Sequence, residues 1–160
     1  ETKNLHLLIE TAEILKSKNF NFNIKIAGAP ILESDKKYFE KLKEKIKEKE
    51  LDGIIEFVGP IPNKDIAEFY QSGDLFANLS DTGSMDKTVL EAMVSGTQIL
   101  VSNEAFADIL PNENKTTKDP EQIVKDIMEI TKIKPSPFMR DYVFSKHNLA
   151  NLISAIVKTY

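Results

Sequence analysis

The sequence predicts a doubly wound α/β fold, in which one parallel sheet lies between helix layers in a Rossmann-like three-layer α/β/α arrangement. Short apolar segments with strand character alternate with helical patterns of about ten to fifteen residues, which is typical of right-handed βαβ units. The segment "TQILVS" at 97–102 contains the continuous apolar run expected of a buried parallel strand. With 160 residues, 41% of them hydrophobic, the chain is long enough for one sizeable core.

Two helices and two strands are predicted in the first part of the chain. The first helix is expected at 4–18, and a strand follows at 22–28. The next helix, at 35–49, has a narrow apolar stripe in a field of Lys and Glu, as solvent-facing helices do. The next strand is expected at 54–59. The apolar positions at helical spacing in the first helix are Leu5, Leu8, Ile9, Ala12 and Leu15.

The middle of the chain continues the alternation. Asn63 is predicted to cap a helix that ends at Gly73, and a strand follows at 74–80. A helix is then expected at 85–95, ending at Gly96, before the strand at 97–102.

The C-terminal part is predicted to be helical. One helix starts at Pro120 and runs to about Lys132, and a second reaches Tyr160 with Ser145 as its cap. We therefore divide the chain into a Rossmann-like domain at 1–134 and a helical extension at 135–160 that packs on it. Because the chain opens on a helix, whereas such a unit normally begins with a strand, a first strand is expected upstream.

Composition excludes several classes of protein. A net charge of -4 and a sequence pI near 5.3 argue against nucleic acid as a partner. Zero Cys removes disulfides and thiolate zinc sites, and with no signal peptide or membrane span the expected location is the cytoplasm. His6 and His147 have no further ligand residue at metal-binding spacing, so no metal site is expected.

The loop after residue 79 is the strongest candidate site. Ligands of doubly wound sheets bind outside the carboxyl ends of the strands, and the following helix, near Met85, would direct free N–H groups there. Gly83 and Ser84 would allow close approach of a phosphate. Lys87 and Glu91 share a helix face, where they are either a phosphate cation and a diol-binding carboxylate or an ordinary surface ion pair.

The same loop also contains two aspartates, which leave a weaker rival open. Asp81 and Asp86 could form the carboxylate pair of a hydrolase, but such a pair must flank a scissile bond.

Four segments, in this order and at these distances, resemble the C-terminal, donor-binding domain of the family 4 (group 1) retaining glycosyltransferases of the GT-B fold. They are "KNLHLLIETAEIL", "IKIAG", "IIEFVGPIPNKDIAEFYQSGDLFANLS" and "DKTVLEAMVSGTQILVS". The resemblance covers roughly residues 1–132 and implies that the chain is the C-terminal half of such a fold.

The resemblance also implies roles for individual residues. Lys3 would contact the donor diphosphate, and Glu91 would hold the ribose hydroxyls. The nucleotide base would lie against the turn at 59–61. The donor-binding residues expected on this basis are Lys3, Gly28, Gly59, Pro60, Ile61, Gly83, Ser84, Met85, Asp86, Lys87 and Glu91.

The chain departs from the family pattern at several points. Gly83 stands where the family has the first of two Glu residues, which contacts the donor sugar, and "GSMDK" replaces a Glu-Gly-Phe-Gly loop. Gly28 is the only glycine kept of a Gly-x-Gly turn. An Arg that accompanies the diphosphate Lys and the acceptor-binding N-terminal domain both lie outside the sequence, so no catalytic residue is assigned in it.

The expected function is sugar transfer from a nucleoside diphosphate to a glycan or lipid-linked acceptor, in polysaccharide biosynthesis and without a cofactor. The expected partners are the nucleotide sugar and the N-terminal domain, through which any peripheral membrane contact would run. The chain alone is expected to be inactive. Within the loop, we expect Asp86 to bind the sugar and Lys87 the phosphate. The alternative is a nucleotide-binding Rossmann-like module without transfer activity.

Overall fold

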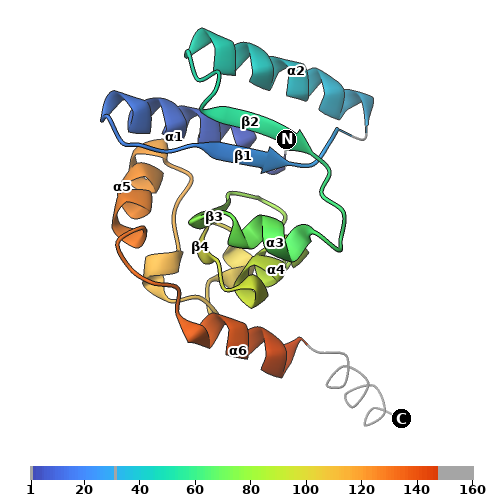
Figure 1. The fold of residues 1–160 in the computed structure, drawn as a ribbon, viewed down its shortest axis with the longest axis vertical. Helices are drawn as coiled ribbons and strands as arrows, with labels where there is room; N and C mark the ends of the chain where they lie inside the picture. Colours follow the sequence, from blue (N-terminus) through green and yellow to red (C-terminus); the bar gives the residue numbers. More distant parts are fainter. Residues whose placement is uncertain (1, 31, 148–160) are drawn as a thin grey trace.

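The computed structural model describes residues 2–30 and 32–147 as an α/β structure whose strands pair in parallel. The first part contains helix α1 (Leu5–Ser17), strand β1 (Ile24–Ala27), helix α2 (Glu33–Glu48) and strand β2 (Ile55–Gly59). Figure 1 shows α2 lying along the β1–β2 pair, with α1 and α5 side by side.

The rest of the described chain continues the alternation and then becomes helical. It contains α3 (Ile66–Gln71), β3 (Leu75–Asn78), α4 (Lys87–Ser95) and β4 (Gln98–Val101). Two short 3-10 helices follow, η1 (Glu104–Phe106) and η2 (Asn112–Asn114), and then α5 (Pro120–Ile130) and α6 (Pro137–Lys146). No helix in the described residues is both long enough and apolar enough to cross a membrane.

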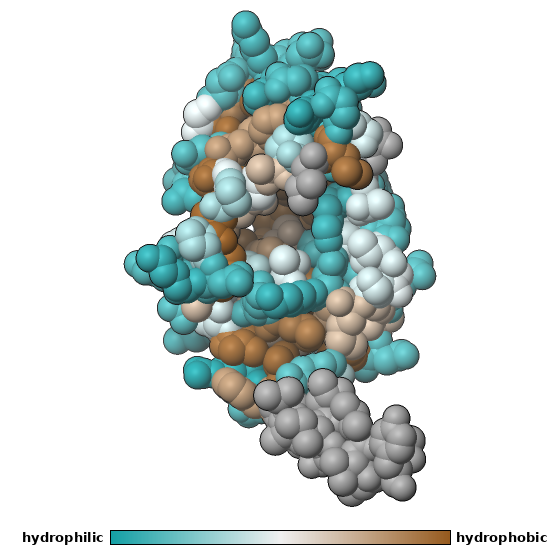
Figure 2. Space-filling model, turned by 90° about the vertical axis from the view of Figure 1, so that its right-hand side faces the viewer, coloured by the Kyte–Doolittle hydropathy of each residue, from teal (hydrophilic) through white to brown (hydrophobic). Residues whose placement is uncertain are grey.

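The strands form two parallel pairs in place of the single continuous sheet that was expected. β1 pairs with β2, starting from Ile24 opposite Ile55, and β3 pairs with β4, starting from Leu75 opposite Gln98. Among the described strands, no ladder joins one pair to the other. Figure 2 shows the molecule hollowed near its middle, with hydrophobic surface inside the hollow. The α/β class with parallel strands is confirmed, and the upstream strand stays a prediction.

The core lies on both faces of β4, all four residues of which are buried. Ile99 and Val101 pack with α4 and α6, whereas Leu100 packs on the other face with α1 and α5. This alternation produces the expected three-layer packing, because successive side chains of a strand point to opposite faces. A third cluster joins α1, α2 and the start of β2.

Besides α2, which begins at Glu33 and was expected from residue 35, three predicted helix starts are wrong. The helix expected from Asn63 begins at Ile66, because residues 62–65 form a turn in which the Asp65 N–H donates to the Pro62 carbonyl at 2.9 Å. The helix expected from Met85 begins at Lys87, because Asp86 has extended backbone angles.

The third wrong start is that of the last helix. α6 begins at Pro137, which fits the first turn of a helix, so Ser145 lies inside it and donates to the Tyr142 carbonyl at 2.9 Å. The rest of the predicted helix, 148–160, lies outside the described residues. α6 contributes Met139 and Val143 to the core cluster of α4, and the proposed boundary at residue 134 stays a prediction.

Candidate functional site

The loop that joins β3 to α4 is built around a left-handed residue and leads into an uncapped helix N-terminus. Gly83 has φ +61°, a conformation that disfavours side-chain-bearing residues. Asp86 is the N-cap residue of α4, but its side chain makes no hydrogen bond to the helix backbone. The Asp86 side chain therefore leaves the first N–H groups of α4 without a cap. A phosphate site at a helix end requires such free N–H groups.

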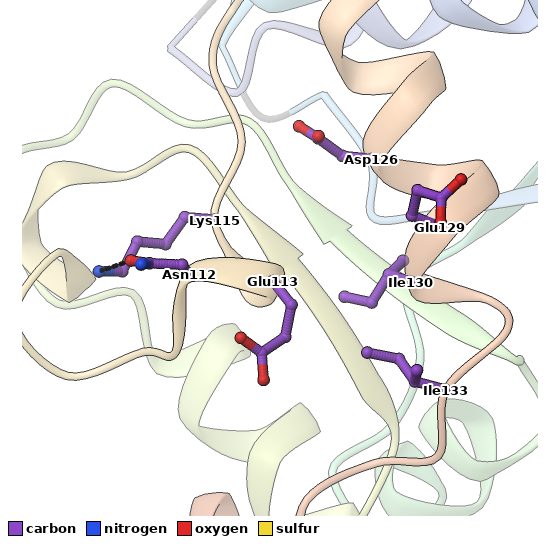
Figure 3. A pocket seen from close by; sticks show the side chains of 7 residues that line it. All are labelled: Asn112, Glu113, Lys115, Asp126, Glu129, Ile130 and Ile133. Carbon is purple, nitrogen blue, oxygen red and sulfur yellow. Dashed lines mark hydrogen bonds between the residues drawn. The ribbon is translucent and has the colours of Figure 1, made fainter.

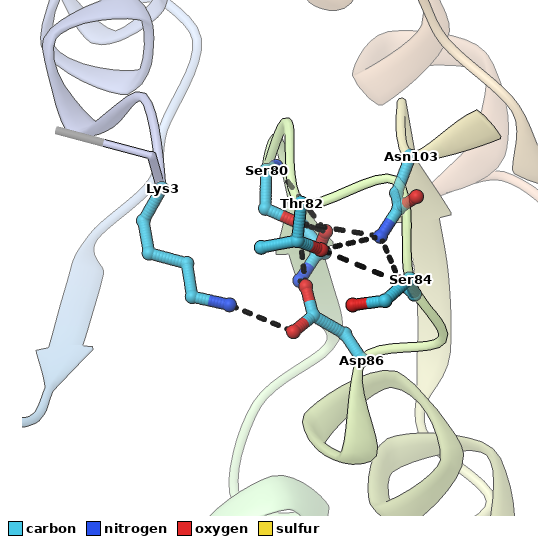
Figure 4. A network of polar contacts seen from close by, with 7 residues as sticks. Lys3, Ser80, Thr82, Ser84, Asp86 and Asn103 are labelled. Carbon is cyan, nitrogen blue, oxygen red and sulfur yellow. Dashed lines mark hydrogen bonds and ion pairs between the residues drawn. The ribbon is translucent and has the colours of Figure 1, made fainter. Parts of the chain in front are cut away.

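The Asp86 carboxylate is the centre of a polar network in this loop (Figure 4). The Lys3 ammonium lies 2.8 Å from Oδ1, and Asn78 donates to Oδ2 at 3.0 Å. Ser80 donates a short hydrogen bond to the same oxygen. Burial raises the pKa of Asp86, but the bonds from Lys3, Ser80 and Asn78 outweigh it and hold the pKa below the ordinary 3.8. The carboxylate is thus ionised and held by three partners.

Asn103, in the segment after β4, holds the loop from its other side. Its amide nitrogen donates to the Ser84 carbonyl at 2.9 Å and reaches the Thr82 hydroxyl at 3.3 Å. Its amide oxygen accepts from the Ala105 N–H, and the residue is only 4% exposed. The conformation of the Gly83 turn is therefore fixed by a buried side chain.

A second set of contacts ties the start of the chain to this loop and so places Lys3 beside it. Asn4 donates to the Leu79 carbonyl at 2.8 Å and to Asp81 Oδ2 at 2.7 Å. The Asp81 N–H donates to the Thr2 carbonyl, and Lys118 forms an ion pair with the Asp81 carboxylate. Asp81 and Asp86 therefore belong to separate networks, which gives the hydrolase-type carboxylate pair no support.

Glu91 lies one turn further along α4, on the face that was predicted. Lys87 Nζ is 3.0 Å from Oε1, and the exposed fractions of the two side chains are 79% and 26%. Tyr70, from α3, donates to Oε2 at 3.3 Å. The predicted pair is present, and the carboxylate is half-buried between an exposed cation and a buried hydroxyl.

Four further predicted residues lie at the carboxyl ends of β1 and β2. The Gly28 N–H donates to the Gly59 carbonyl at 2.8 Å, and both glycines have positive φ. Pro60 and Ile61 follow directly. Within the described residues, no hydrogen bond or ion pair joins this turn to the loop at 80–86. The predicted residues therefore form two groups, one at this turn and one around the loop at 80–86. Met85 belongs to the group around the loop at 80–86, and it is 39% exposed.

Three residues of the polar network were not predicted from the sequence: Asn78, Ser80 and Asn103. Their signal was present, because Asn78 ends β3 and Asn103 follows closely on β4, at the strand ends where doubly wound sheets bind ligands. Buried amides at such positions stabilise loops by hydrogen bonding, which residue spacing alone does not reveal.

Two cavities are lined by none of the predicted site residues. One, of about 240 Å³, is formed by η2, α5 and Ile133 and has the acidic residues Glu113, Asp126 and Glu129 in its lining (Figure 3). The other, of about 180 Å³, lies at the carboxyl end of β4 and includes Asn103. Within 2–30 and 32–147 no three His, Asp or Glu side chains are grouped as metal ligands.

The chain is similar to known sugar-transferring proteins. The sequence model of the family described as glycosyl transferases group 1 matches residues 1–141. Mannosylfructose-phosphate synthase of Agrobacterium fabrum is 27% identical over 144 residues, covering 88% of this chain and 31% of that protein. Alpha-monoglucosyldiacylglycerol synthase of Streptococcus pneumoniae is 26% identical over 104 residues, covering 65% and 22%. The chain thus spans a third or less of the length of these relatives.

Solved structures show the same fold. The Anabaena protein HepE, crystallised with UDP-glucose, superposes with a TM-score of 0.82 at 16% identity, covering 99% of this chain and 45% of that one. The C-terminal domain of a group 1 glycosyl transferase, LpcC of Francisella tularensis, has a TM-score of 0.76 at 23% identity and covers 92% and 81%. The described fold is therefore that of a C-terminal GT-B domain.

Proposed function

Because this chain belongs to the group 1 glycosyl transferases, we propose that it is the donor-binding part of a retaining hexosyltransferase that moves a sugar from a nucleoside diphosphate onto a glycan or lipid-linked acceptor. In the reaction, the acceptor hydroxyl oxygen bonds to the anomeric carbon as the bond from that carbon to the diphosphate breaks. The hydroxyl proton leaves with the diphosphate. An N-terminal acceptor-binding domain of the same protein is the proposed partner.

The position of Lys3 against the first turn of α4 is the observation that carries this proposal. Lys3 and Asp86 are 83 positions apart in sequence, yet their charged groups lie 2.8 Å apart at the N-cap of α4. The ammonium and the positive end of the helix dipole therefore act on the same place. A diphosphate that replaces the Asp86 carboxylate as the partner of Lys3 interacts with both the ammonium and the helix dipole. The leaving group is then stabilised without a metal or another cofactor.

The other predicted contacts complete the donor site in this proposal. Glu91 accepts the ribose hydroxyls, because its carboxylate keeps acceptor capacity beyond its bonds to Tyr70 and Lys87. The turn at 59–61 lies against the nucleotide base, and Gly28 binds the donor next to it, because its N–H donates to the Gly59 carbonyl. Lys87, which is mostly exposed, leaves Glu91 to approach a phosphate. Asp86 contacts the sugar only after it has left Lys3.

The zero cysteine count is compatible with a reducing compartment, and we propose the cytoplasm on that ground. The two relatives have names that point to different products, a sugar phosphate and a glycolipid, so no single acceptor is assigned.

A nucleotide-binding module without transfer activity is the second candidate. Gly83 favours it, because a glycine offers no carboxylate to the donor sugar where the resembling family has Glu. Turnover of a nucleotide sugar by the intact protein, measured as release of nucleoside diphosphate, separates the two candidates. Release that exceeds the uncatalysed rate supports the enzyme, and binding without release supports the module.

Lys3→Ala in the intact protein tests the donor site. We expect the affinity for nucleoside diphosphate to fall by about 1 to 3 kcal/mol, as when a charged hydrogen-bond partner is removed. Lys132→Ala is the control, because it removes the same charge from an exposed ion pair with Glu129 on the far end of α5. Equal losses in the two variants, measured by calorimetry, would remove Lys3 from the site.

A further inference from the structure

Tyr70 is a buried residue of α3 whose hydroxyl contacts Glu91 of α4. Its side chain is 6% exposed, and its ring meets the Phe76 ring edge-on with the centroids 5.3 Å apart. The same cluster contains Val89 and Ala92 of α4. A tyrosine held in this way has few conformations left, so its hydroxyl is a fixed donor.

The two oxygens of Glu91 are restrained to different degrees. Oε1 faces Lys87, whose side chain is 79% exposed, and an exposed pair of this kind holds its geometry weakly. Oε2 accepts from the Tyr70 hydroxyl, which comes from the core. The orientation of the carboxylate is therefore set mainly from the Tyr70 side.

We propose that Tyr70 is a positioning residue that holds the Glu91 carboxylate in the orientation that accepts the two ribose hydroxyls. A carboxylate has about four lone-pair sites, of which the bond to Tyr70 occupies one and Lys87 occupies a second until it moves to the phosphate. The remaining two are available to a vicinal diol. This inference rests on the proposed function, because it takes the ribose as the ligand of Glu91.

The chemistry of the hydroxyl supports this role. Burial, the charge of Glu91 and the hydrogen bond to it all raise the pKa of Tyr70 above its ordinary value of 10.0. The hydroxyl therefore stays protonated at neutral pH and remains a donor. Gln71 donates to the Ser95 carbonyl at 3.2 Å, a second link between the two helices that does not depend on Tyr70.

Tyr70→Phe in the intact protein tests the proposal, because it removes only the hydroxyl. The probes are UDP, GDP and ADP, each paired with its 2′,3′-dideoxy counterpart, with affinities measured by calorimetry. We expect Tyr70→Phe to bind the preferred ribonucleotide about 3- to 10-fold more weakly, and the dideoxy form as well as wild type does. Tyr142→Phe, which removes a hydroxyl beside the same core cluster, should change neither affinity.

The double variant Tyr70→Phe, Glu91→Gln provides the second measurement. If Tyr70 acts through Glu91, adding Tyr70→Phe to Glu91→Gln should cause little further loss. Full additivity would overturn the inference, and so would an equal loss for the ribo and dideoxy forms. If Tyr70→Phe keeps wild-type affinity while Glu91→Gln binds the nucleotide more weakly, only the role of Tyr70 is overturned, and the ribose contact of Glu91 stands. Unchanged affinity in Glu91→Gln would overturn the ribose contact of the proposed function as well.

Discussion

Asp86 connects the start of the chain, the end of β3 and the first turn of α4 through one carboxylate. Its partners are Lys3, Asn78 and Ser80, and its side chain is 13% exposed. A partly buried carboxylate that accepts from three donors stabilises a loop most strongly while it is charged. The residue therefore links the stability of the candidate site to pH.

Asp86→Asn should lower the free energy of unfolding at neutral pH by about 1 to 3 kcal/mol, because the charge-assisted bonds are lost. The pKa of Asp86 is lowered below 3.8 in the folded state, so its contribution is present above the unfolded value and is lost as pH falls through the folded value. Urea unfolding at pH 7 and at successively lower pH should show the difference from wild type shrinking below pH 3.8.

The control for this prediction is Asp108→Asn, which changes an exposed carboxylate outside the network. It should alter stability little at any of these pH values. A difference between wild type and Asp86→Asn that stayed constant through the acid range would contradict the account of Asp86.

Individual site residues were only partly predictable from the sequence. Lys87 and Glu91 form the predicted pair because helical spacing fixes which side chains are neighbours. The contact of Lys3 with Asp86 was not predicted, because it joins segments 83 positions apart, and long-range side-chain contacts have no signature in local spacing. The resemblance supplied a role for Lys3 but not its partner.

At the scale of the element, α4 presents its N-terminus to the site and ends at a left-handed residue. Gly96 has φ +77°, and a Cβ added there would meet no atom within 4 Å. The cost of a side chain at this position is therefore conformational.

Gly96→Ala should lower the free energy of unfolding by about 1 to 2 kcal/mol, the cost of the left-handed conformation for an L-residue, and leave nucleotide affinity unchanged. Gly73→Ala, at the end of α3, is the matched control. Its φ is not in the left-handed region and its added Cβ would meet only the Tyr70 carbonyl oxygen, at 3.8 Å. Thermal unfolding should separate the two variants. Equal destabilisation would show that the cost at Gly96 is not conformational.

Helix and strand existence was predictable where apolar periodicity was strong, and helix starts were not. α1 and α2 lie within two residues of their predicted bounds because their apolar stripes define them. The starts of α3 and α6 were wrong because a turn at 62–65 and the Pro137 ring decide them, and these local features compete with capping signals at Asn63 and Ser145.

At the scale of the molecule, the strands form two parallel pairs. Within the described residues, β1 pairs only with β2, and β3 pairs only with β4. The sequence predicted parallel strands correctly but could not predict how many sheets they form, because periodicity identifies strands and not their partners. Strand edges without a neighbour can recruit another chain.

We expect the 160-residue chain alone to show no sugar transfer and to bind nucleoside diphosphate more weakly than the intact protein. The reason is that it spans 31% or less of the length of the two relatives, and that no ladder joins the strand pairs within the residues that the structure describes. Sedimentation should also show concentration-dependent self-association. Transfer by the chain alone at the rate of the intact protein would contradict the two-domain proposal.

The nucleotide affinity of Glu91→Gln in the intact protein is the measurement that tests the donor site most directly. Calorimetry with UDP, GDP and ADP first identifies the nucleotide that wild type binds. We expect Glu91→Gln to bind it about 1 to 3 kcal/mol more weakly, because a charged acceptor of the ribose hydroxyls becomes a neutral amide. Equal affinities of the two proteins would contradict the account and leave Lys87 and Glu91 as an ordinary ion pair on the surface of α4.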